Sequence, residues 1–592
     1  MDQVDENPAD MNPADMNPAD MNPADMSAVG ADADGTGGEH EYDVVVVGSG
    51  AGGLTAALTA RLRGLSAVVV EKTGRFGGST ALSGGAIWVP NNLYLEEAGQ
   101  RDTPENARAY LDATVGERVP AERKDAYLAR GPEMLRYLHD RTRWVRFVYT
   151  PGYSDYYPEL PGGKPEGRSV EPRIVDGRKL GPEFARMRRA GLPTYGLTMT
   201  SADFGKLNMV TRTWKGKRTA VRVGLRAAGA LLTGRRLLSL GEALVARLRL
   251  ALAEAGGELW LNSPFRDLVI EDGRVTGVRV RRGGRDVTVR ARHGVVLAAG
   301  GFSHAQDLRE KYLPAPTTTD WTHAAEGQTG DTLLAGLRAG AAVDLMEKVW
   351  GAPSVPAPDG PPFFLVADRA VPAMVIVDGN GERYVRESLP YHEFVDRMYE
   401  HGEPAMNSWM IVDARAKSRY IVVGLFPGQK FPKRWHETGA VRTAATPAGL
   451  AAAIGVPAAK LEATIARFNG FARAGADADF RRGDSAYDNY YGDPTLPNPN
   501  LAPLDKGPFY AVRVVPGDIG TKGGLVTDAD ARVLRADGTP VPGLYATGNC
   551  SAAVTGETYP GPGATIGPAM TFGYAAATHI AERKPVAQGG KP

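Results

Sequence analysis

Three glycines and one acid near residue 50 have the types and spacing needed to hold a pyrophosphate and a ribose. In the glycine-rich run over residues 48–53, Gly48 permits a tight turn, Gly50 lets the backbone approach a pyrophosphate, and Gly53 lets a helix pack closely on a strand. The phosphates would lie at the N-terminus of the helix that follows. Glu71 has the spacing expected of a carboxylate that accepts hydrogen bonds from a ribose.

The elements that must position these residues form a predicted strand–helix–strand unit. Residues 43–47 predict a buried strand, residues 54–64 a helix and residues 67–70 a second strand. A glycine turn alone is a weak signal. Together with the flanking elements and Glu71, however, it predicts a dinucleotide site.

A second glycine-rich loop, over residues 72–80, favours FAD over NAD as the nucleotide. Flavoproteins place such a loop along the diphosphate and the ribityl chain, and the small residues over 81–90 suit backbone close to the isoalloxazine. The residues that we expect to contact the cofactor in this part of the chain are Lys72, Gly77, Gly78, Ser79, Thr80, Ser83 and Gly84.

Composition limits the possible functions. The net charge of +1 argues against a nucleic-acid partner. The single cysteine, Cys550, excludes an intramolecular disulfide and a cysteine-cluster metal site, and it fits a cytoplasmic protein. No signal-peptide pattern is evident, and the nine histidines show no metal-binding spacing, so we expect no metal.

The chain is expected to begin and end in flexible tails. Residues 7–26 repeat Asn-Pro-Ala-Asp-Met four times, and residues 1–40 have too few apolar groups to pack, which predicts disorder. The repeated methionines leave the true start of the protein open. Residues 581–592 are predicted to form a flexible tail.

Between the tails, we expect an α/β protein with a Rossmann-like FAD-binding domain in two parts, residues 41–345 and 516–580. An α+β catalytic domain, residues 346–515, is inserted between them, with helices expected around residues 447–454 and 458–474. Residues 265–280 predict a hairpin turning at Asp272-Gly273. Two buried strands return to the nucleotide fold and bring further cofactor contacts: Gly300, Gly548 and Asn549. Ile566 opens a last helix, whose free N–H groups could face the flavin's pyrimidine end.

The segment over residues 212–236 is basic, with apolar residues between its charges and no acid. Such a segment can lie in an anionic membrane interface, or it can be a solvated basic face on a surface helix, and the sequence favours neither. It is too charged to span a bilayer. Its basic residues are Arg212, Lys215, Lys217, Arg218, Arg222, Arg226, Arg235 and Arg236.

An aromatic segment over residues 147–158 is interrupted by proline and glycine and does not alternate as an amphipathic strand would. Taken alone, it favours a loop that only packs.

Several motifs together resemble the fumarate reductase and succinate dehydrogenase flavoprotein superfamily. They are the glycine fingerprint, residues 76–78, the strand end at 299–301, residues 521–524 and residues 544–549. Within that superfamily, residues 155–157, 388–391 and 559–563 resemble 3-ketosteroid Δ1-dehydrogenases. The resemblance covers roughly residues 41–580 and replaces the packing interpretation of the aromatic segment.

The resemblance implies a role for four residues. Tyr391 matches the base that removes the C2 proton, and Tyr156 matches the tyrosine that hydrogen-bonds to it. Tyr559 and the backbone N–H of Gly563 match the pair that holds the C3 carbonyl oxygen. Holding that oxygen acidifies the neighbouring carbon, because the donors form an oxyanion hole. Hydride from C1 would go to N5 of a non-covalently bound FAD, and an external acceptor, with a quinone as a guess, would take the electrons.

The same resemblance leaves rivals open. A Δ4-(5α)-ketosteroid dehydrogenase or a fumarate reductase shares the superfamily, and Arg383 and Arg386 lie near Tyr391 in the sequence, where a dicarboxylate clamp could use them. A non-catalytic steroid-binding flavoprotein is the remaining alternative. Neither the steroid side chain nor the oligomeric state follows from the sequence.

Overall fold

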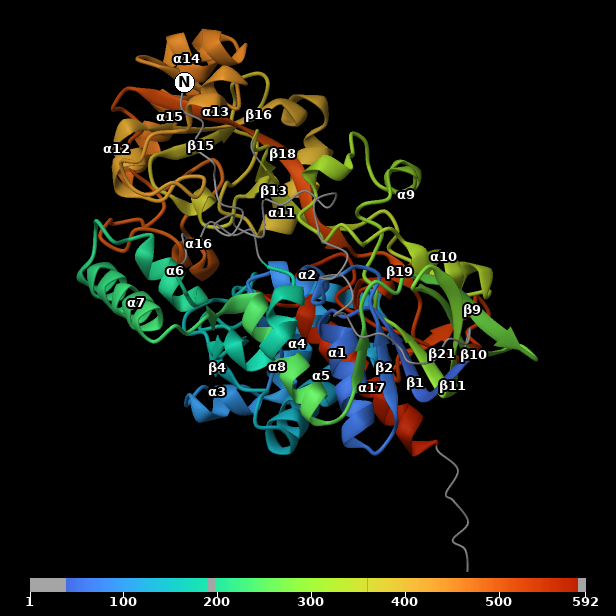
Figure 1. Ribbon diagram of the computed structural model, residues 1–592. Coiled ribbons are helices and arrows are strands. Elements are labelled where there is room, and N and C mark those ends of the chain that lie inside the picture. The colour runs from blue at the N-terminus through green and yellow to red at the C-terminus, as the bar shows by residue number, and fades with distance from the viewer. Residues whose placement is uncertain (1–38, 190–196, 359, 584–592) are drawn as a thin grey trace, which may run out of the picture.

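The computed structural model describes residues 39–189, 197–358 and 360–583 (Figure 1). Most of the tail predicted over residues 1–40, and residues 584–592 of the C-terminal tail, lie outside the described residues. His40 already belongs to strand β1 (His40–Val47), and helix α17 (Ile566–Glu582) runs past residue 580. Both ordered elements therefore extend slightly into the predicted tails.

The predicted strand–helix–strand unit is confirmed, with one correction. Strand β1, helix α1 (Ala51–Leu62) and strand β2 (Ala67–Val70) follow one another, and the two strands are parallel. The helix begins at Ala51 rather than at residue 54, because Gly50 is the extended N-cap residue and its carbonyl accepts from Leu54 N–H at 2.9 Å. Gly53 therefore lies inside the first turn.

These strands lie in the middle of an eight-stranded sheet. The order is β20-β21-β11-β1-β2-β8, with β20 (Arg532–Leu534) and β8 (Glu258–Trp260) at its two ends. Strand β1 pairs in parallel with β11 (Arg285–Leu297), and β11 pairs in parallel with β21 (Pro540–Ala546). Valines alternate between the two faces: Val44 and Val46 pack in one apolar core, Val45 and Val47 in another. Helices α1, α17 and α5 (Ala121–Arg141) lie together on the first face (Figure 1).

The predicted hairpin is confirmed. Strands β9 (Phe265–Glu271) and β10 (Arg274–Arg282) are joined by Asp272 and Gly273, both at positive φ. Strand β10 also pairs with β11, so the hairpin extends the main sheet.

A second, antiparallel sheet has the order β14-β13-β18-β16-β15, with β17 also on β18. Its outer strands are β14 (Phe363–Phe364), β15 (Met374–Val377) and β17 (Val441–Ala444). Its central strands are β13 (Val349–Val355), β16 (Ser408–Asp413) and β18 (Phe509–Thr521), and helices α14 (Pro447–Ile454) and α15 (Ala458–Ala474) have the predicted bounds. The two sheets confirm the predicted fold class. Because β18 continues past residue 515, the domain boundaries themselves remain predictions.

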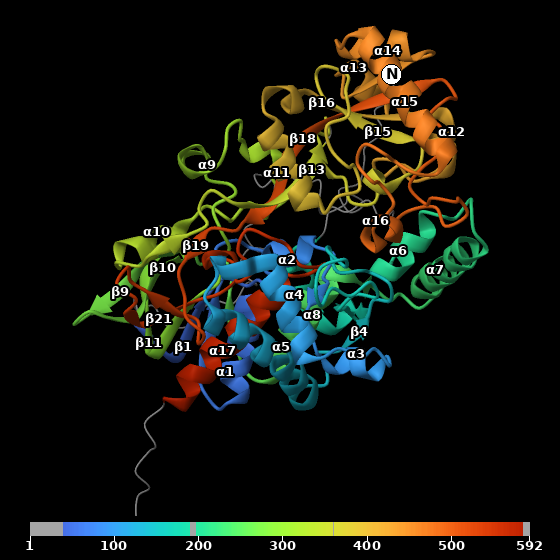
Figure 2. The same ribbon diagram turned by 180° about the vertical axis from the view of Figure 1, so that it is seen from behind.

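The basic segment forms helix α7 (Trp214–Leu232) at the outer edge of the molecule, beside α6 (Ser201–Leu207) in both views (Figures 1 and 2). Within the described parts of the chain, no helix is long and apolar enough to cross a membrane. The aromatic segment is not entirely a loop, since Phe147–Tyr149 forms strand β4 against β5 (Ser169–Pro172). This pairing fixes the start of the segment, and residues 153–156 further along it are buried.

Candidate active site

The glycine turn after β1 has the geometry of a phosphate cradle. Gly48 has φ +105°, and a Cβ there would lie 2.4 Å from the Ala298 oxygen. A Cβ on Gly53 would lie 2.0 Å from the Gly48 oxygen, whereas one on Gly50 would meet only Thr80 Oγ1, at 3.6 Å. The chain is therefore closed behind Gly48 and Gly53 and open at Gly50, at the N-terminus of α1, where a helix can hold phosphates.

Glu71 directly follows β2, and protein groups hold both of its oxygens. Ser49 Oγ donates to Oε2 at 2.6 Å, and the Thr73 backbone N–H donates to Oε1 at 3.0 Å. A carboxylate has about four acceptor positions, and the Ser49 N–H at 3.3 Å and the Thr73 hydroxyl at 3.1 Å occupy the other two, so a ribose hydroxyl would have to replace one of these four donors. The position of Glu71 is thus fixed before any ligand binds.

The second glycine-rich loop folds back onto the first. Gly77 and Gly78 have positive φ, and Thr80 Oγ1 accepts from Ala51 N–H at 3.0 Å. Lys72 Nζ is bound to Asp331 at 2.9 Å, and Ser79 Oγ contacts the side chain of Gln328. The loop therefore lines the open side of the cradle, as the cofactor prediction requires.

The other predicted cofactor residues come from several parts of the chain. Ser83 Oγ donates to the Thr80 oxygen at 2.7 Å, and a Cβ on Gly84 would meet nothing within 4 Å. Gly300 and Gly548 both have positive φ at the ends of β11 and β21, and Ile566 is the first residue of α17. Asn549 Oδ1 accepts from Trp350 Nε1 at 3.2 Å, which links the cofactor residues to the second sheet.

Three predicted tyrosines meet where the two sheets approach each other. The Tyr156 hydroxyl donates to the Tyr391 hydroxyl at 2.8 Å. The ring of Tyr559 lies 5.1 Å from that of Tyr156 and 5.3 Å from that of Tyr391, and both contacts are edge to face. Since the three residues come from distant parts of the chain, only the tertiary fold brings their hydroxyls together.

Each tyrosine is fixed by its own segment. Tyr391 is the first residue of α11 (Tyr391–His401), and the Tyr156 backbone N–H donates to the Pro560 oxygen at 2.9 Å. Asp155, which precedes Tyr156, accepts from Trp88 Nε1 at 2.8 Å and is paired with the buried Arg168. Contacts within the protein therefore hold the segments that carry Tyr156 and Tyr391.

Burial raises the pKa of all three tyrosine hydroxyls above the ordinary value. At Tyr391, the hydrogen bond from Tyr156 opposes that rise. At Tyr559, a hydrogen bond with the backbone of Gly563 is among the groups that oppose it. Gly563 has φ +97°, and a Cβ there would lie 2.3 Å from the Ala86 oxygen, so this position requires glycine.

Several residues around the tyrosines had not been singled out from the sequence as site residues. Tyr487 lies 4.8 Å from the Tyr156 ring, and Trp350 lies 4.8 Å from the Tyr559 ring. His392 is buried, and its Nε2 lies 3.2 Å from the Tyr157 hydroxyl. Its place directly after Tyr391 was the only available signal.

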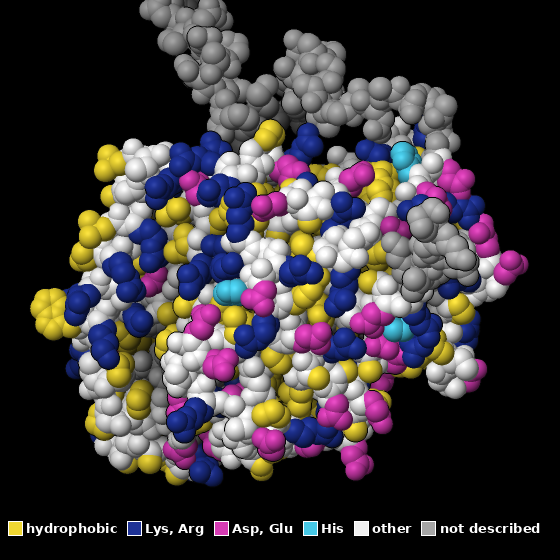
Figure 3. All heavy atoms as spheres, turned by 90° about the horizontal axis from the view of Figure 1, so that it is seen from below, with side chains coloured by type: hydrophobic (Ala, Val, Ile, Leu, Met, Phe, Trp, Pro, Cys, Tyr) yellow, Lys and Arg dark blue, Asp and Glu magenta, His cyan; other side chains and the backbone are white. Residues whose placement is uncertain are grey.

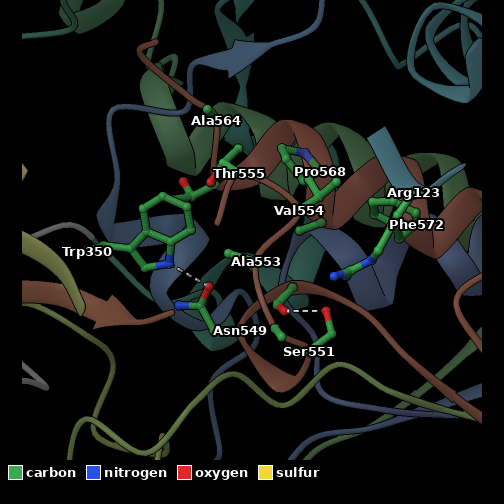
Figure 4. A pocket seen from close by; sticks show the side chains of 14 residues that line it. Arg123, Trp350, Asn549, Ser551, Ala553, Val554, Thr555, Ala564, Pro568 and Phe572 are labelled. Atoms are coloured by element: carbon green, nitrogen blue, oxygen red, sulfur yellow. Dashed lines mark hydrogen bonds between the residues drawn. The ribbon is translucent and has the colours of Figure 1, made fainter. Parts of the chain in front are cut away.

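A pocket adjoins the cofactor residues between α17 and residues 548–555 (Figure 4). Asn549 and Trp350 line one side, with the hydrogen bond between them drawn. On the other side, the Arg123 guanidinium lies 5.2 Å from the centre of the Phe572 ring. The pocket is continuous with the predicted flavin contacts at residues 548 and 549.

Comparison with known proteins identifies the class. The FAD binding domain family matches residues 43–566, so the chain is a flavoprotein of that family and FAD is its cofactor. The glycine cradle fits that cofactor.

More specific relatives are 3-oxosteroid 1-dehydrogenases. The one from Mycolicibacterium smegmatis is 50% identical over 559 residues, covering 91% of this chain and 97% of the relative. The one from Mycobacterium tuberculosis (strain H37Rv) is 50% identical over 557 residues, covering 92% and 99%. The crystal structure of a 3-ketosteroid Δ1-dehydrogenase from Sterolibacterium denitrificans, in complex with 1,4-androstadiene-3,17-dione, has a TM-score of 0.86 at 41% identity, covering 92% of this chain and 100% of that chain. The chain belongs to the 3-oxosteroid 1-dehydrogenase family.

Proposed function

We propose that this protein is an FAD-dependent 3-oxosteroid 1-dehydrogenase, which introduces the 1,2 double bond into a 3-ketosteroid. The observation that carries the proposal is the 2.8 Å hydrogen bond between two buried tyrosine hydroxyls, with a third tyrosine against both rings. A neutral ketone needs hydroxyl donors and a base of high pKa, and this cluster offers both.

Tyr391 acts as the base that takes the C2 proton. Its pKa is raised by burial, so it needs help to lose its own proton near neutral pH. The Tyr156 hydroxyl donates to Tyr391 and stabilises the tyrosinate. Bound FAD supplies the acceptor for the hydride that leaves C1.

Tyr559 and Gly563 hold the C3 carbonyl oxygen. The Tyr559 hydroxyl and the Gly563 N–H are donors in one small space, since the Gly563 backbone already hydrogen-bonds to that hydroxyl. Two donors at the oxygen favour the enolate that forms as the C2 proton leaves.

The surroundings of Arg383 and Arg386 argue against a dicarboxylate reductase. Arg383 donates to Glu387 at 2.7 Å and to Asp477 at 2.8 Å, and all three side chains are buried. Arg386 lies 3.8 Å from the buried Asp488. Both guanidiniums therefore face carboxylates of the protein, and a substrate dicarboxylate would have to displace them.

The test is turnover of androst-4-ene-3,17-dione by purified holoenzyme with an artificial electron acceptor, followed by mass spectrometry and NMR of the product. We expect a product lighter by two hydrogens, with the new double bond between C1 and C2. Reoxidation of prereduced flavin by fumarate, without steroid turnover, would instead place the protein with the reductases.

We further propose that α7 rests on an anionic membrane. Trp214, Val221, Leu225 and Leu232 recur at intervals of seven, four and seven residues, so they lie on one stripe, opposite the buried Gly216 and Val223. Their exposed fractions run from 62% to 86%. Hydrophobic and basic side chains stand side by side at this edge of the molecule (Figure 3).

Some basic residues of the segment pair with acids of the protein, and another flanks the apolar stripe. Arg212 is paired with Asp493, and Arg222 and Arg226 are paired with Asp203, so these three serve the fold. Lys217 lies over the Trp214 ring at 5.2 Å and flanks the stripe. Lysine beside exposed aromatic and aliphatic groups suits the headgroup region of an anionic bilayer. A lipid-soluble quinone in that bilayer is the electron acceptor that we propose.

Co-sedimentation with phosphatidylglycerol vesicles tests the membrane proposal. We expect Leu225→Ser combined with Leu232→Ser to lose most of the binding. Ile270→Ser, which removes an exposed aliphatic group from the β9 hairpin, should leave binding unchanged. If the Leu225→Ser, Leu232→Ser variant binds the vesicles as well as the Ile270→Ser control, the assignment of membrane binding to α7 is wrong.

A further inference from the structure

Two buried basic side chains lie behind the two segments that carry the reacting tyrosines. One segment, residues 387–390, leads into Tyr391, and the other, residues 557–558, leads into Tyr559. Neither belongs to a strand of either sheet. Their backbone carbonyls are held by side chains from elsewhere in the chain: Arg369 for the first segment and Lys522 for the second.

Arg369 is 1% exposed and spreads its donors over three carbonyls. Its Nη1 donates to the oxygens of Glu387 at 2.9 Å and Leu389 at 2.6 Å, and its Nε donates to the Leu365 oxygen at 2.8 Å. No carboxylate of the described residues lies within 4.0 Å of it, although the neighbouring Asp368 feels its charge. A planar, five-donor guanidinium is suited to this forked arrangement.

Lys522 is also 1% exposed, and its Nζ donates at 2.6 Å to the oxygens of both Glu557 and Thr558. It lies 4.4 Å from the centre of the Trp350 ring, which packs on Tyr559. Burial lowers the pKa of Lys522 to about 7, and the charged groups around it are Asp396 of α11, Lys348 and Glu557. Lys522 therefore touches the peptide units directly before Tyr559 and the ring beside it.

Burying a cation without a paired carboxylate is costly, and neutral donors could satisfy the same carbonyls. Charge-assisted bonds fix those carbonyls more firmly than neutral ones would. Arg369 also opposes the burial-raised pKa of Tyr487, whose ring packs on Tyr156, so its charge reaches the hydroxyl cluster.

We infer that Arg369 and Lys522 are positioning residues for the proposed desaturation. Arg369 sets the place of the Tyr391 hydroxyl against C2, and Lys522 sets the place of the Tyr559 hydroxyl against the C3 oxygen. The inference rests on the proposed function. It predicts that loss of either basic side chain displaces one tyrosine and disturbs the part of the substrate that this tyrosine contacts.

Two readouts separate these roles from general stability. The first is exchange of the C2 hydrogen of androst-4-ene-3,17-dione for solvent deuterium. The second is the C3 carbonyl stretching frequency of bound 1,4-androstadiene-3,17-dione, measured by isotope-edited infrared spectroscopy. Arg369→Met should slow the exchange roughly 10²-fold, as expected when a reacting group is misplaced by about 1 Å, and leave the carbonyl frequency unchanged. Lys522→Met should move that frequency toward the free ketone, and slow exchange as well.

Lys417 supplies a matched control. It is a buried lysine that donates to the Gln429 oxygen and lies 5.2 Å from the Phe431 ring, away from the tyrosines. Lys417→Met should change neither readout. If Arg369→Met and Lys522→Met behave like this control, or if both shift the carbonyl frequency equally, the inference is wrong.

Conservative variants keep the test decisive if the methionine variants lose FAD. Arg369→Lys keeps the charge but cannot fork across three carbonyls, so it should retain FAD and still exchange C2 hydrogen more slowly than wild type. Wild-type exchange in Arg369→Lys would overturn the inference. Failure of the proposed function would be distinct: the wild-type protein itself would then neither exchange C2 hydrogen nor desaturate the steroid.

Discussion

The cofactor cradle and the tyrosine cluster are built in opposite ways. In the cradle, backbone conformation matters most: glycines at 48 and 53 allow contacts that a Cβ would block, and most of the parts lie within one short stretch of chain. In the cluster, side chains matter most, and they come from residues 156, 391 and 559. We therefore expect the cradle to lose FAD when a Cβ is added, and the cluster to lose steroid turnover when a hydroxyl is removed.

The largest expected effect is on the cradle. Gly53→Ala would place a Cβ 2.0 Å from the Gly48 oxygen, so α1 must move away from the turn. We expect the purified variant to contain little FAD, measured as the ratio of flavin to protein absorbance. Gly470→Ala is the control, because a Cβ there meets nothing within 4 Å. Full FAD content in Gly53→Ala would contradict the comparison.

Next in size is the removal of the base. Tyr391→Phe should keep its FAD and lose about 10²- to 10⁴-fold in steroid turnover, the usual contribution of a general base. Tyr384→Phe is matched to it, because this buried hydroxyl bonds Ser408 Oγ at 2.8 Å in the same half of the protein. Steady-state turnover of the two variants should differ by most of that factor, and similar losses would argue against a special role for Tyr391.

Tyr156→Phe should have a smaller, pH-dependent effect. The hydrogen bond from Tyr156 holds the pKa of Tyr391 below the value that burial alone would give. Without it that pKa rises, so the limb of the pH–rate profile that ascends with pH should move to higher pH. Each unit of movement lowers the rate on that limb about tenfold. An unmoved limb would show that Tyr156 acts in some other way.

The smallest effect is expected at Glu71. Ser49 and Thr73 hold both of its oxygens, and an amide could keep part of that network. Glu71→Gln should weaken FAD binding by about tenfold, the equivalent of one charge-assisted hydrogen bond, and leave turnover at saturating FAD unchanged. Isothermal titration of the apoprotein would measure this. A loss of FAD as complete as in Gly53→Ala would mean that side chains matter as much as backbone conformation for FAD binding in the cradle.

The same contrast decides what could be predicted from the sequence. The cradle, the Asp272-Gly273 hairpin and helices α14 and α15 carry local signals, and the structure confirms them with small shifts at their ends. The predicted N-terminus of α1 is three residues too late, because glycine is a poor helix former and residues 52 and 53 are both glycine. In the structure Gly53 lies in the first turn, where a Cβ would clash with the Gly48 oxygen.

The tyrosine cluster had no local signal. From composition alone, the aromatic segment around Tyr156 favoured packing, and only the resemblance to a family joined it to Tyr391 and Tyr559. Tyr487 and Trp350 join the cluster through contacts with distant parts of the chain, which no spacing could indicate. Only His392 had a signal, because it directly follows Tyr391. The partners of Arg222 and Arg226 were hidden for the same reason, because Asp203 lies outside the basic segment.

The most direct test of the central claim is anaerobic mixing of the holoenzyme with androst-4-ene-3,17-dione while the flavin absorbance is followed. The structure predicts rapid bleaching in the wild-type protein, with loss of one hydrogen each from C1 and C2. It also predicts almost no bleaching in Tyr391→Phe with equal FAD content. Bleaching at the wild-type rate in Tyr391→Phe, or none in either protein, would contradict the assignment of Tyr391 and of the desaturation.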